Sequence, residues 1–460
     1  VGAAVNVDQS GTTVDHIEIV NSTVGISDGA GFSAPGVANI TDVIIRGTNG
    51  PFERGVEIAN SDGQFRFDNV RLSNLGNDGF VVSAADGDVV ITNSSLTDVN
   101  GIGIAATGNA AQISVASTTL TRIDGTAIEA SGDDSVITVS ATTISDTRGV
   151  DGDAIVASGD RARIDIGTTA TTTMTGQGIV ASGTDSVVTA TDSTITDTGS
   201  PAVLVEGTGA TVYLDNTDIS DVAGTGIVIN APDAVVQMTN GSTLSDTTLN
   251  GIDVLDADAE LFVLGRSIIR DIGADGIFTD GATILVQDSN IQTVVGAGIR
   301  AVGVSGAADS VVAVQGSSIA NALDGGIVTL NSNLRVERLD ASNPLSRVTT
   351  ITNTGLFGIQ AVADSIGPPN EYQVLVSNTT IGAVSVGISI EASPDVLNPP
   401  PGLVPPGIVP TINFTALNNT ITATNGPGIS VNAVFDASIG FPGGPLSRVN
   451  ALIEGNRVQG

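Results

Sequence analysis

A short repeat runs through the sequence and constrains the fold more than any other feature. A small residue followed by an aliphatic or aromatic residue recurs at a nearly fixed interval. The step is 24 residues from Phe80 to Ile104, and again from Ile104 to Ile128. Self-similarity at such a period indicates a repeat architecture, in which each unit buries its apolar face only against its neighbours. The chain is therefore expected to form a solenoid.

Two further registers move with the same period. One is a pair of aliphatic residues two positions apart, such as Val89 and Ile91, and the other is a lone aliphatic residue, such as Leu96. Each period thus holds three short segments separated by Gly, Asp, Asn, Ser or Thr. Alternation of apolar and polar residues with a period of two indicates strands rather than helices. Three strands in roughly 24 residues are the coil of a parallel β-helix.

The expected fold class is all-β: a right-handed parallel β-helix solenoid of about 16 coils, each of roughly 24 residues with three short strands. A β-sandwich or a propeller is the alternative, but a propeller blade needs about 40 to 50 residues. Residues 1–460 are expected to form a single solenoid. Within it we expect irregular first coils in 1–50, regular coils in 51–330, and longer coils with Pro-rich loops in 331–460.

Composition excludes several classes of protein. The net charge is -33 and the chain contains no Lys. Such a surface repels phosphate backbones and anionic lipids, so neither nucleic-acid binding nor membrane insertion is expected. The absence of Cys excludes disulfides, thiolate metal sites and thiol catalysis. A hydrophobic content of 41% is too high for a disordered acidic chain. The acidic composition suggests an extracellular or cell-surface location.

One form of the repeat is Ser, any residue, Ile or Leu, any residue, Asp or Asn, four residues, then a small residue and an aliphatic. Ser193 to Val203 follow this pattern. It resembles the right-handed parallel β-helix superfamily, which has the pectin-lyase-like fold, over nearly the whole chain. That superfamily includes pectin-active lyases and hydrolases, alginate epimerases, phage tailspikes and bacterial surface proteins. The regularity of this chain is most similar to the surface and fibre proteins.

The catalytic segments of those enzymes are absent from the sequence. Neither the Gly-His-Gly segment of polygalacturonases nor the Asp-Pro-His segment of alginate epimerases occurs. The one histidine is His16, whose expected role is that of a strand-end residue bonded to a turn. The alternative role for His16 is a catalytic base or a metal ligand. We therefore expect that the chain is not an enzyme and has no catalytic residues.

A ladder of acids follows the lone aliphatic residue by two positions. Asp and Asn tolerate unusual φ and bond their own backbone in turns, so one interpretation is a structural turn stacked from coil to coil. The other interpretation is a cation site, because Ca²⁺ takes six to eight oxygen ligands. No other cofactor is expected. The candidate metal ligands are Asp98, Asp146, Asp197, Asp221, Asp246 and Asp271.

The expected function is structural: a rigid, acidic, non-catalytic rod that forms part of a surface stalk, fibre, filament or adhesin by coil stacking. The expected partners are copies joined end to end, neighbouring segments of a longer chain, or a surface polysaccharide. The alternative is a carbohydrate-active or carbohydrate-binding β-helix with its groove near 331–446. The aromatic residues available there to stack on sugar rings are Phe357, Tyr372, Phe414, Phe435 and Phe441.

Overall fold

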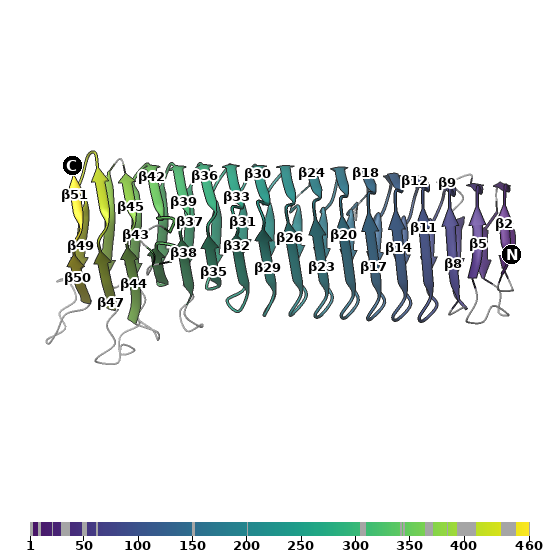
Figure 1. The fold of residues 1–460 in the computed structure, drawn as a ribbon, viewed down its shortest axis with the longest axis horizontal. Helices are drawn as coiled ribbons and strands as arrows, with labels where there is room; N and C mark the ends of the chain where they lie inside the picture. The colour runs from purple at the N-terminus through teal and green to yellow at the C-terminus, as the bar shows by residue number, and fades with distance from the viewer. Residues whose placement is uncertain are drawn as a thin grey trace, which may run out of the picture. The chain divides into compact units, whose positions relative to one another are not determined.

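All regular structure in the described residues is β-strand (Figure 1). The computed structural model describes residues 3–7, 11–20, 22–28, 37–47, 53–60, 63–149, 152–199, 201–303, 310–340, 343, 346–363, 371–383, 385–392, 411–433 and 448–459. Residues 393–410, which are part of the Pro-rich loops predicted in 331–460, lie outside them. The chain divides into two compact units, Val1–Ile227 with Asp233–Val235, and Val228–Pro232 with Val236–Gly460. The prediction of one solenoid domain stays a prediction.

In the first unit, successive strands contribute in rotation to three parallel sheets, called A, B and C. Sheet A contains β1 (Val5–Val7), β4 (Val24–Asp28), β7 (Arg54–Ile58), β10 (Phe80–Val82), β13 (Ile104–Ala106), β16 (Ile128–Ala130), β19 (Ile155–Ala157), β22 (Ile179–Ala181) and β25 (Val203–Val205). Sheet B contains β2 (Thr13–Asp15), β5 (Val37–Thr41), β8 (Gln64–Asp68), β11 (Asp88–Thr92), β14 (Gln112–Ala116), β17 (Val136–Ser140), β20 (Arg163–Gly167), β23 (Val187–Thr191) and β26 (Thr211–Asp215). Sheet C contains β3 (Glu18–Val20), β6 (Ile44–Arg46), β9 (Arg71–Leu75), β12 (Ser95–Val99), β15 (Thr119–Ile123), β18 (Thr143–Thr147), β21 (Ala170–Met174), β24 (Thr194–Thr198) and β27 (Asp218–Val222).

The second unit repeats the same rotation of strands. Its sheet A contains β31 (Ile252–Val254), β34 (Ile277–Asp280), β37 (Ala297–Val302), β40 (Gly325–Leu330), β43 (Phe357–Ala363), β46 (Val386–Ala392) and β49 (Ile429–Ala433). Its sheet B contains β32 (Glu260–Leu264), β35 (Thr283–Gln287), β38 (Val311–Gln315), β41 (Asn333–Glu337), β44 (Glu371–Ser377), β47 (Thr411–Leu417) and β50 (Arg448–Glu454). Its sheet C contains β30 (Thr243–Thr247), β33 (Ile268–Ile272), β36 (Asn290–Val294), β39 (Ser318–Ala322), β42 (Thr350–Thr354), β45 (Thr380–Ala383), β48 (Thr420–Ala423) and β51 (Arg457–Gln459). Two strands, β28 (Ile227–Ile229) and β29 (Val235–Thr239), have residues in both units.

The repeat registers of the sequence are the inward-facing columns of these sheets. In the first unit Phe80 pairs with Ile104, which pairs with Ile128, and all three side chains are buried. Val89 and Ile91 occupy the inward positions of sheet B, and Leu96 that of sheet C. Because the period returns each aliphatic residue to the same place one coil later, the side chains stack into a continuous apolar core. The predicted parallel β-solenoid is confirmed.

A column of buried hydroxyl groups lines the turns from sheet B to sheet C in the first unit. Each hydroxyl donates to the carbonyl oxygen two residues earlier, as Ser94 does to Thr92 (2.7 Å) and Thr217 to Asp215 (3.2 Å). Buried carbonyl groups are costly when unpaired, so these side chains satisfy a requirement that each turn creates. The column consists of Ser94, Thr118, Thr142, Thr169, Ser193 and Thr217.

Searching the described residues for an apolar helix of bilayer-spanning length yields none.

Candidate functional site

A groove of about 370 Å³ lies on the outward face of sheet B in the second unit. It lies over β38, β41, β44 and β47. The groove coincides with a change in strand length, because β41 has five residues and β44 has seven. Leu334 pairs with Val374, so β44 begins two residues before the level at which β41 begins. Asn333 bridges this step, since its side-chain oxygen accepts the backbone N–H of Gln373 at 2.8 Å.

Apart from the buried Leu334 and Val374, outward side chains of these strands give the groove a mixed polar and aliphatic lining. Three carboxamides, one guanidinium and one hydroxyl stand beside aliphatic carbon. A carboxamide offers two N–H donors and an oxygen acceptor in one plane, whereas a guanidinium offers donors only. The lining residues are Val311, Asn333, Leu334, Arg335, Gln373, Val374, Leu375, Asn413 and Thr415.

Neighbouring side chains hold several of these polar groups in place. The Asn413 amide donates to Glu371 Oε1 at 2.5 Å, and the Asn450 amide donates to Asn413 Oδ1 at 2.8 Å. The Arg335 guanidinium lies 2.8 Å from Glu337 Oε1, and the Glu337 side chain is only 8% exposed. Groups fixed in this way lose little conformational freedom when a ligand binds.

The aromatic residues that the sequence offered for sugar stacking do not line this groove. Tyr372 and Phe414 occupy inward positions and are buried in the core, at 4% and 1% exposure. Phe357 begins β43 in sheet A. Phe435 and Phe441 lie outside the described residues.

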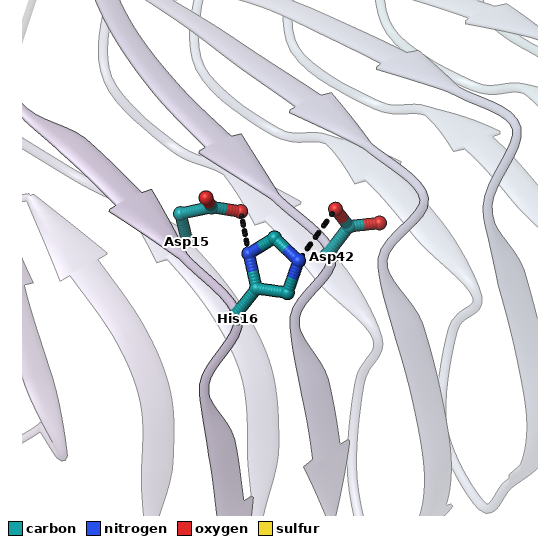
Figure 2. A group of neighbouring side chains, drawn as sticks. All are labelled: Asp15, His16 and Asp42. Atoms are coloured by element: carbon teal, nitrogen blue, oxygen red, sulfur yellow. Dashed lines mark ion pairs between the residues drawn. The ribbon is translucent and has the colours of Figure 1, made fainter.

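A second cluster surrounds the single histidine, in the first unit (Figure 2). His16 directly follows β2, as expected of a strand-end residue, and has a left-handed backbone with φ of 53°. Its Nδ1 lies 2.7 Å from Asp15 Oδ1, and its Nε2 lies 3.5 Å from Asp42 Oδ2. The hydrogen bond to Asp15, reinforced by the charges of Asp15 and Asp42, raises the pKa of His16. The pKa of Asp15 is lowered, first by the hydroxyl of Thr41 and then by His16.

The two ring nitrogens of His16 face different carboxylates, on opposite sides of the ring. Both nitrogens are donors only in the protonated imidazolium. The geometry therefore favours a bound proton that links the turns after β2 and β5. Ligand atoms of Asp15, His16 and Asp42 lie within 4.8 Å of one another. Across the described part of the chain, no other group of three or more histidine and acidic side chains is close enough to share an ion.

The ladder acids share a backbone conformation rather than a ligand geometry. All six occupy the fourth position of a five-residue strand in sheet C, with φ between 56° and 59°. The predicted turn is thus a left-handed bend inside each strand. Arg122 and Thr173 adopt the same φ of 56° at equivalent positions. Asp and Asn tolerate this conformation better than most residues, which supports the structural interpretation of the ladder.

Several ladder carboxylates are paired with cations or hydroxyls. Asp98 accepts from Arg122 at 2.5 and 2.8 Å, and this hydrogen bond lowers the pKa of Asp98. Asp271 accepts from Arg270 at 2.6 Å, and Asp146 from Arg148 at 2.7 Å. The Ca²⁺ site at Asp98, Asp146, Asp197, Asp221, Asp246 and Asp271 stays a prediction.

The groove residues were missed by the sequence reasoning. The signal available was one amide at an outward position in each of two strand segments, Asn333 in 333–337 and Gln373 in 371–377. The predicted interval 331–446 for a groove contains most of the lining. The strand-length step that opens it is not visible in the repeat.

No family model matches the sequence, and no curated protein matches it. Solved structures do match. The Vag8–C1 inhibitor complex contains a chain with 12% identity and a TM-score of 0.50, over 99% of this chain and 100% of that one. The A-module of the Azotobacter vinelandii mannuronan C-5 epimerase AlgE6 has 13% identity and a TM-score of 0.35, over 93% and 91%. The tailspike of E. coli bacteriophage HK620, in complex with a pentasaccharide, has 11% identity and a TM-score of 0.29, over 91% and 72%.

These comparisons correct one prediction and confirm another. The prediction that the chain is not an enzyme is wrong, because the similar structures include epimerases, which are enzymes. The absence of their sequence segments therefore does not exclude catalysis. At identities of 11 to 13% the likeness shows the fold alone. The chain has the right-handed parallel β-helix fold.

Proposed function

We propose that this chain is an extracellular or periplasmic, carbohydrate-active β-solenoid that binds a polysaccharide in the groove over β38, β41, β44 and β47. The observation that carries the proposal is the lining, in which three carboxamides, a guanidinium and a hydroxyl surround aliphatic carbon. A volume of about 370 Å³ lies within the range of small-ligand sites. The extracellular or periplasmic location rests on the acidic composition.

The chemistry of a sugar ring fits this lining. A hydroxyl group donates one hydrogen bond and accepts others, so it needs donors and acceptors side by side, which Asn and Gln provide. The less polar face of the ring can lie against Val311 and Leu375, which are half-buried. Asn413 and Arg335 are already held by Glu371 and Glu337, so binding orders few side chains.

Calorimetry with soluble oligosaccharides tests the proposal. Gln373→Ala removes an exposed lining amide, and its matched control is Gln112→Ala, at the same outward column of sheet B in the first unit. We expect at least one oligosaccharide to bind, Gln373→Ala to weaken it by about fivefold, and Gln112→Ala to leave it unchanged. Chromatography of the incubated sugars then reports on turnover. If none of a set of neutral and acidic oligosaccharides binds, the proposal is refuted.

An assembly role as a stalk, fibre or adhesin stays a prediction from the repeat. Negative-stain electron microscopy of the purified protein tests it, and long filaments with an axial repeat are the supporting result. Single particles at every concentration would remove the self-assembling part of that prediction.

A further inference from the structure

We infer that the groove is one end of a longer track along sheet B of the second unit, and that the track takes a linear, neutral glycan lying across the strands from β32 to β47. This inference rests on the proposed function, and it specifies the length, direction and charge of the ligand.

The first observation is an outward column in which paired residues continue from the groove. Arg335 pairs with Ala313, Ala313 with Leu285, and Leu285 with Phe262. In each strand the neighbouring residues point inward and are buried, so these side chains face outward. Phe262, Leu285 and Ala313 are only half-buried there. We call this column the midline of the track. Between the groove and β32 the midline is apolar.

The same column in the first unit has a different character. Its successive paired members are Arg66, Val90, Ser114, Thr138, Asp165, Thr189 and Tyr213. Outward positions of a solvated sheet are normally polar, and here Val90 and Tyr213 stand singly among polar residues. Three successive apolar residues in the second unit therefore depart from the pattern of the same protein, which points to a surface that contacts a ligand.

The second observation is a row of amides beside the midline. Gln287 Nε2 donates to Gln315 Oε1 at 3.1 Å, and Gln315 Nε2 donates to Glu337 Oε1 at 2.9 Å. On the other side of the midline stand Glu260 and Thr283, beside Phe262 and Leu285, and then Asn333 and Gln373 within the groove. Each row is two residues from the midline, or about 7 Å. The track is therefore bordered by hydrogen-bonding groups on both sides of an apolar strip that can receive sugar rings.

The third observation is the charge of the track. Among the outward side chains of its six strands, Arg335 is the only cation in the described residues, and Glu337 already pairs with it. Glu260 and Glu371 add acids at the strand starts. The chain as a whole carries -33. The negative charge of this face would repel a polyanionic glycan and weaken its binding, whereas a neutral glycan is not repelled.

The length of the track sets the size of the ligand. Five strand spacings separate β32 from β47, which at about 4.8 Å each gives roughly 24 Å. The groove alone, from β38 to β47, covers three spacings or about 14 Å. A short oligosaccharide fills the groove, and only a longer one reaches Leu285 and Phe262.

Calorimetry with oligosaccharides of two lengths tests the inference. The probes are tri- and hexasaccharides of β-1,4-glucan and β-1,4-mannan, with hexamannuronate and hexagalacturonate as the acidic counterparts. We expect a neutral hexasaccharide to bind and Phe262→Ala to weaken it on the order of tenfold, because a Phe contact is lost. The trisaccharide should bind Phe262→Ala and the unaltered protein equally. Tyr213→Ala is the matched control, since Tyr213 is an exposed aromatic residue at the same column of the first unit.

The outcomes separate this inference from the proposed function. If no glycan binds at all, both fail. If a glycan binds and Gln373→Ala weakens it, but Phe262→Ala has no effect on any hexasaccharide, the track is refuted and the groove stands. Tighter binding of the acidic hexasaccharides would refute the neutral ligand. Leu285→Ala repeats the test one strand nearer to the groove, and circular dichroism checks that each variant is folded.

Discussion

A column of glycines packs the turns that follow sheet A in the first unit so closely that a side chain cannot enter. A Cβ atom added to Gly183 would lie 2.1 Å from the carbonyl oxygen of Gly159 in the preceding coil. Gly207 and Gly132 show the same approach, at 2.2 Å. Real Cβ atoms do not come within 3.0 Å of such an atom, so Gly183→Ala requires the two coils to separate locally.

The cost of this separation follows from the contact. The obstacle is backbone, which cannot rotate away as a flexible side chain can, and overpacking of this kind costs about 1–3 kcal/mol. The coil contacts that must stretch include the hydrogen bonds from the N–H groups of Ser182 and Gly183 to Ala157, at 2.9 and 3.2 Å. The damage should be local, because each coil of a solenoid contacts only its neighbours.

Hydrogen exchange measured by mass spectrometry tests this prediction. Amides near Gly183 should exchange roughly 5- to 150-fold faster in Gly183→Ala, as a local loss of 1–3 kcal/mol requires. Gly167→Ala is the matched control, since nothing lies within 4 Å of its added Cβ, and there the substitution should be neutral or slightly stabilising. Equal exchange in the two variants would refute the packing argument.

Three further predictions concern polar groups. The pKa of His16 should exceed its ordinary value of 6.5 in an NMR titration and fall in Asp15→Asn, because the hydrogen bond to Asp15 raises it. Since the folded-state pKa is the higher one, the stabilisation is complete below the unfolded pKa and is lost as pH rises through the folded pKa; an unraised pKa would contradict this. Thr217→Val should lower the free energy of unfolding by about 1 kcal/mol in urea, because it removes a buried hydroxyl whose one hydrogen is shared between the carbonyl oxygens of Ala190 and Asp215. An unchanged midpoint would argue against the hydroxyl column. Asp275→Ala should cost about 1–3 kcal/mol by the same assay, because the Ala297 N–H loses its acceptor at 2.6 Å, and Asp275→Asn should retain part of that stability.

The sequence predicted the positions of the acid ladder but not the physical reason for them. Asp98 and Asp146 recur at one repeat position, and the sequence allowed either a structural or a metal-binding reason for this. The structure places Arg122 at the same position with the same φ as Asp98. Because Arg122 adopts this conformation without a carboxylate, the torsion angles support the structural interpretation, and the metal site stays a prediction.

The groove could not be predicted in detail for a different reason. Asn333, Gln373 and Asn413 are separated by 40 residues at each step, and nothing in the repeat marks them as neighbours. Their proximity depends on the pairing of β41 with β44 and of β44 with β47, across long intervening segments. Tyr372 and Phe414 looked suitable for sugar binding by residue type, but strand phase points both into the core.

The sequence by itself determined the fold, its three sheets and the identity of the core columns. This was possible because a repeat of 24 residues brings each inward aliphatic residue, such as Ile104, onto its counterpart one coil later, so the pattern that stabilises one coil stabilises the next. The tertiary structure alone decided where the surface departs from the repeat. Outward side chains such as Phe262 and Arg335 are not constrained by the core, so their grouping follows from strand lengths and pairing across coils, which the period does not encode.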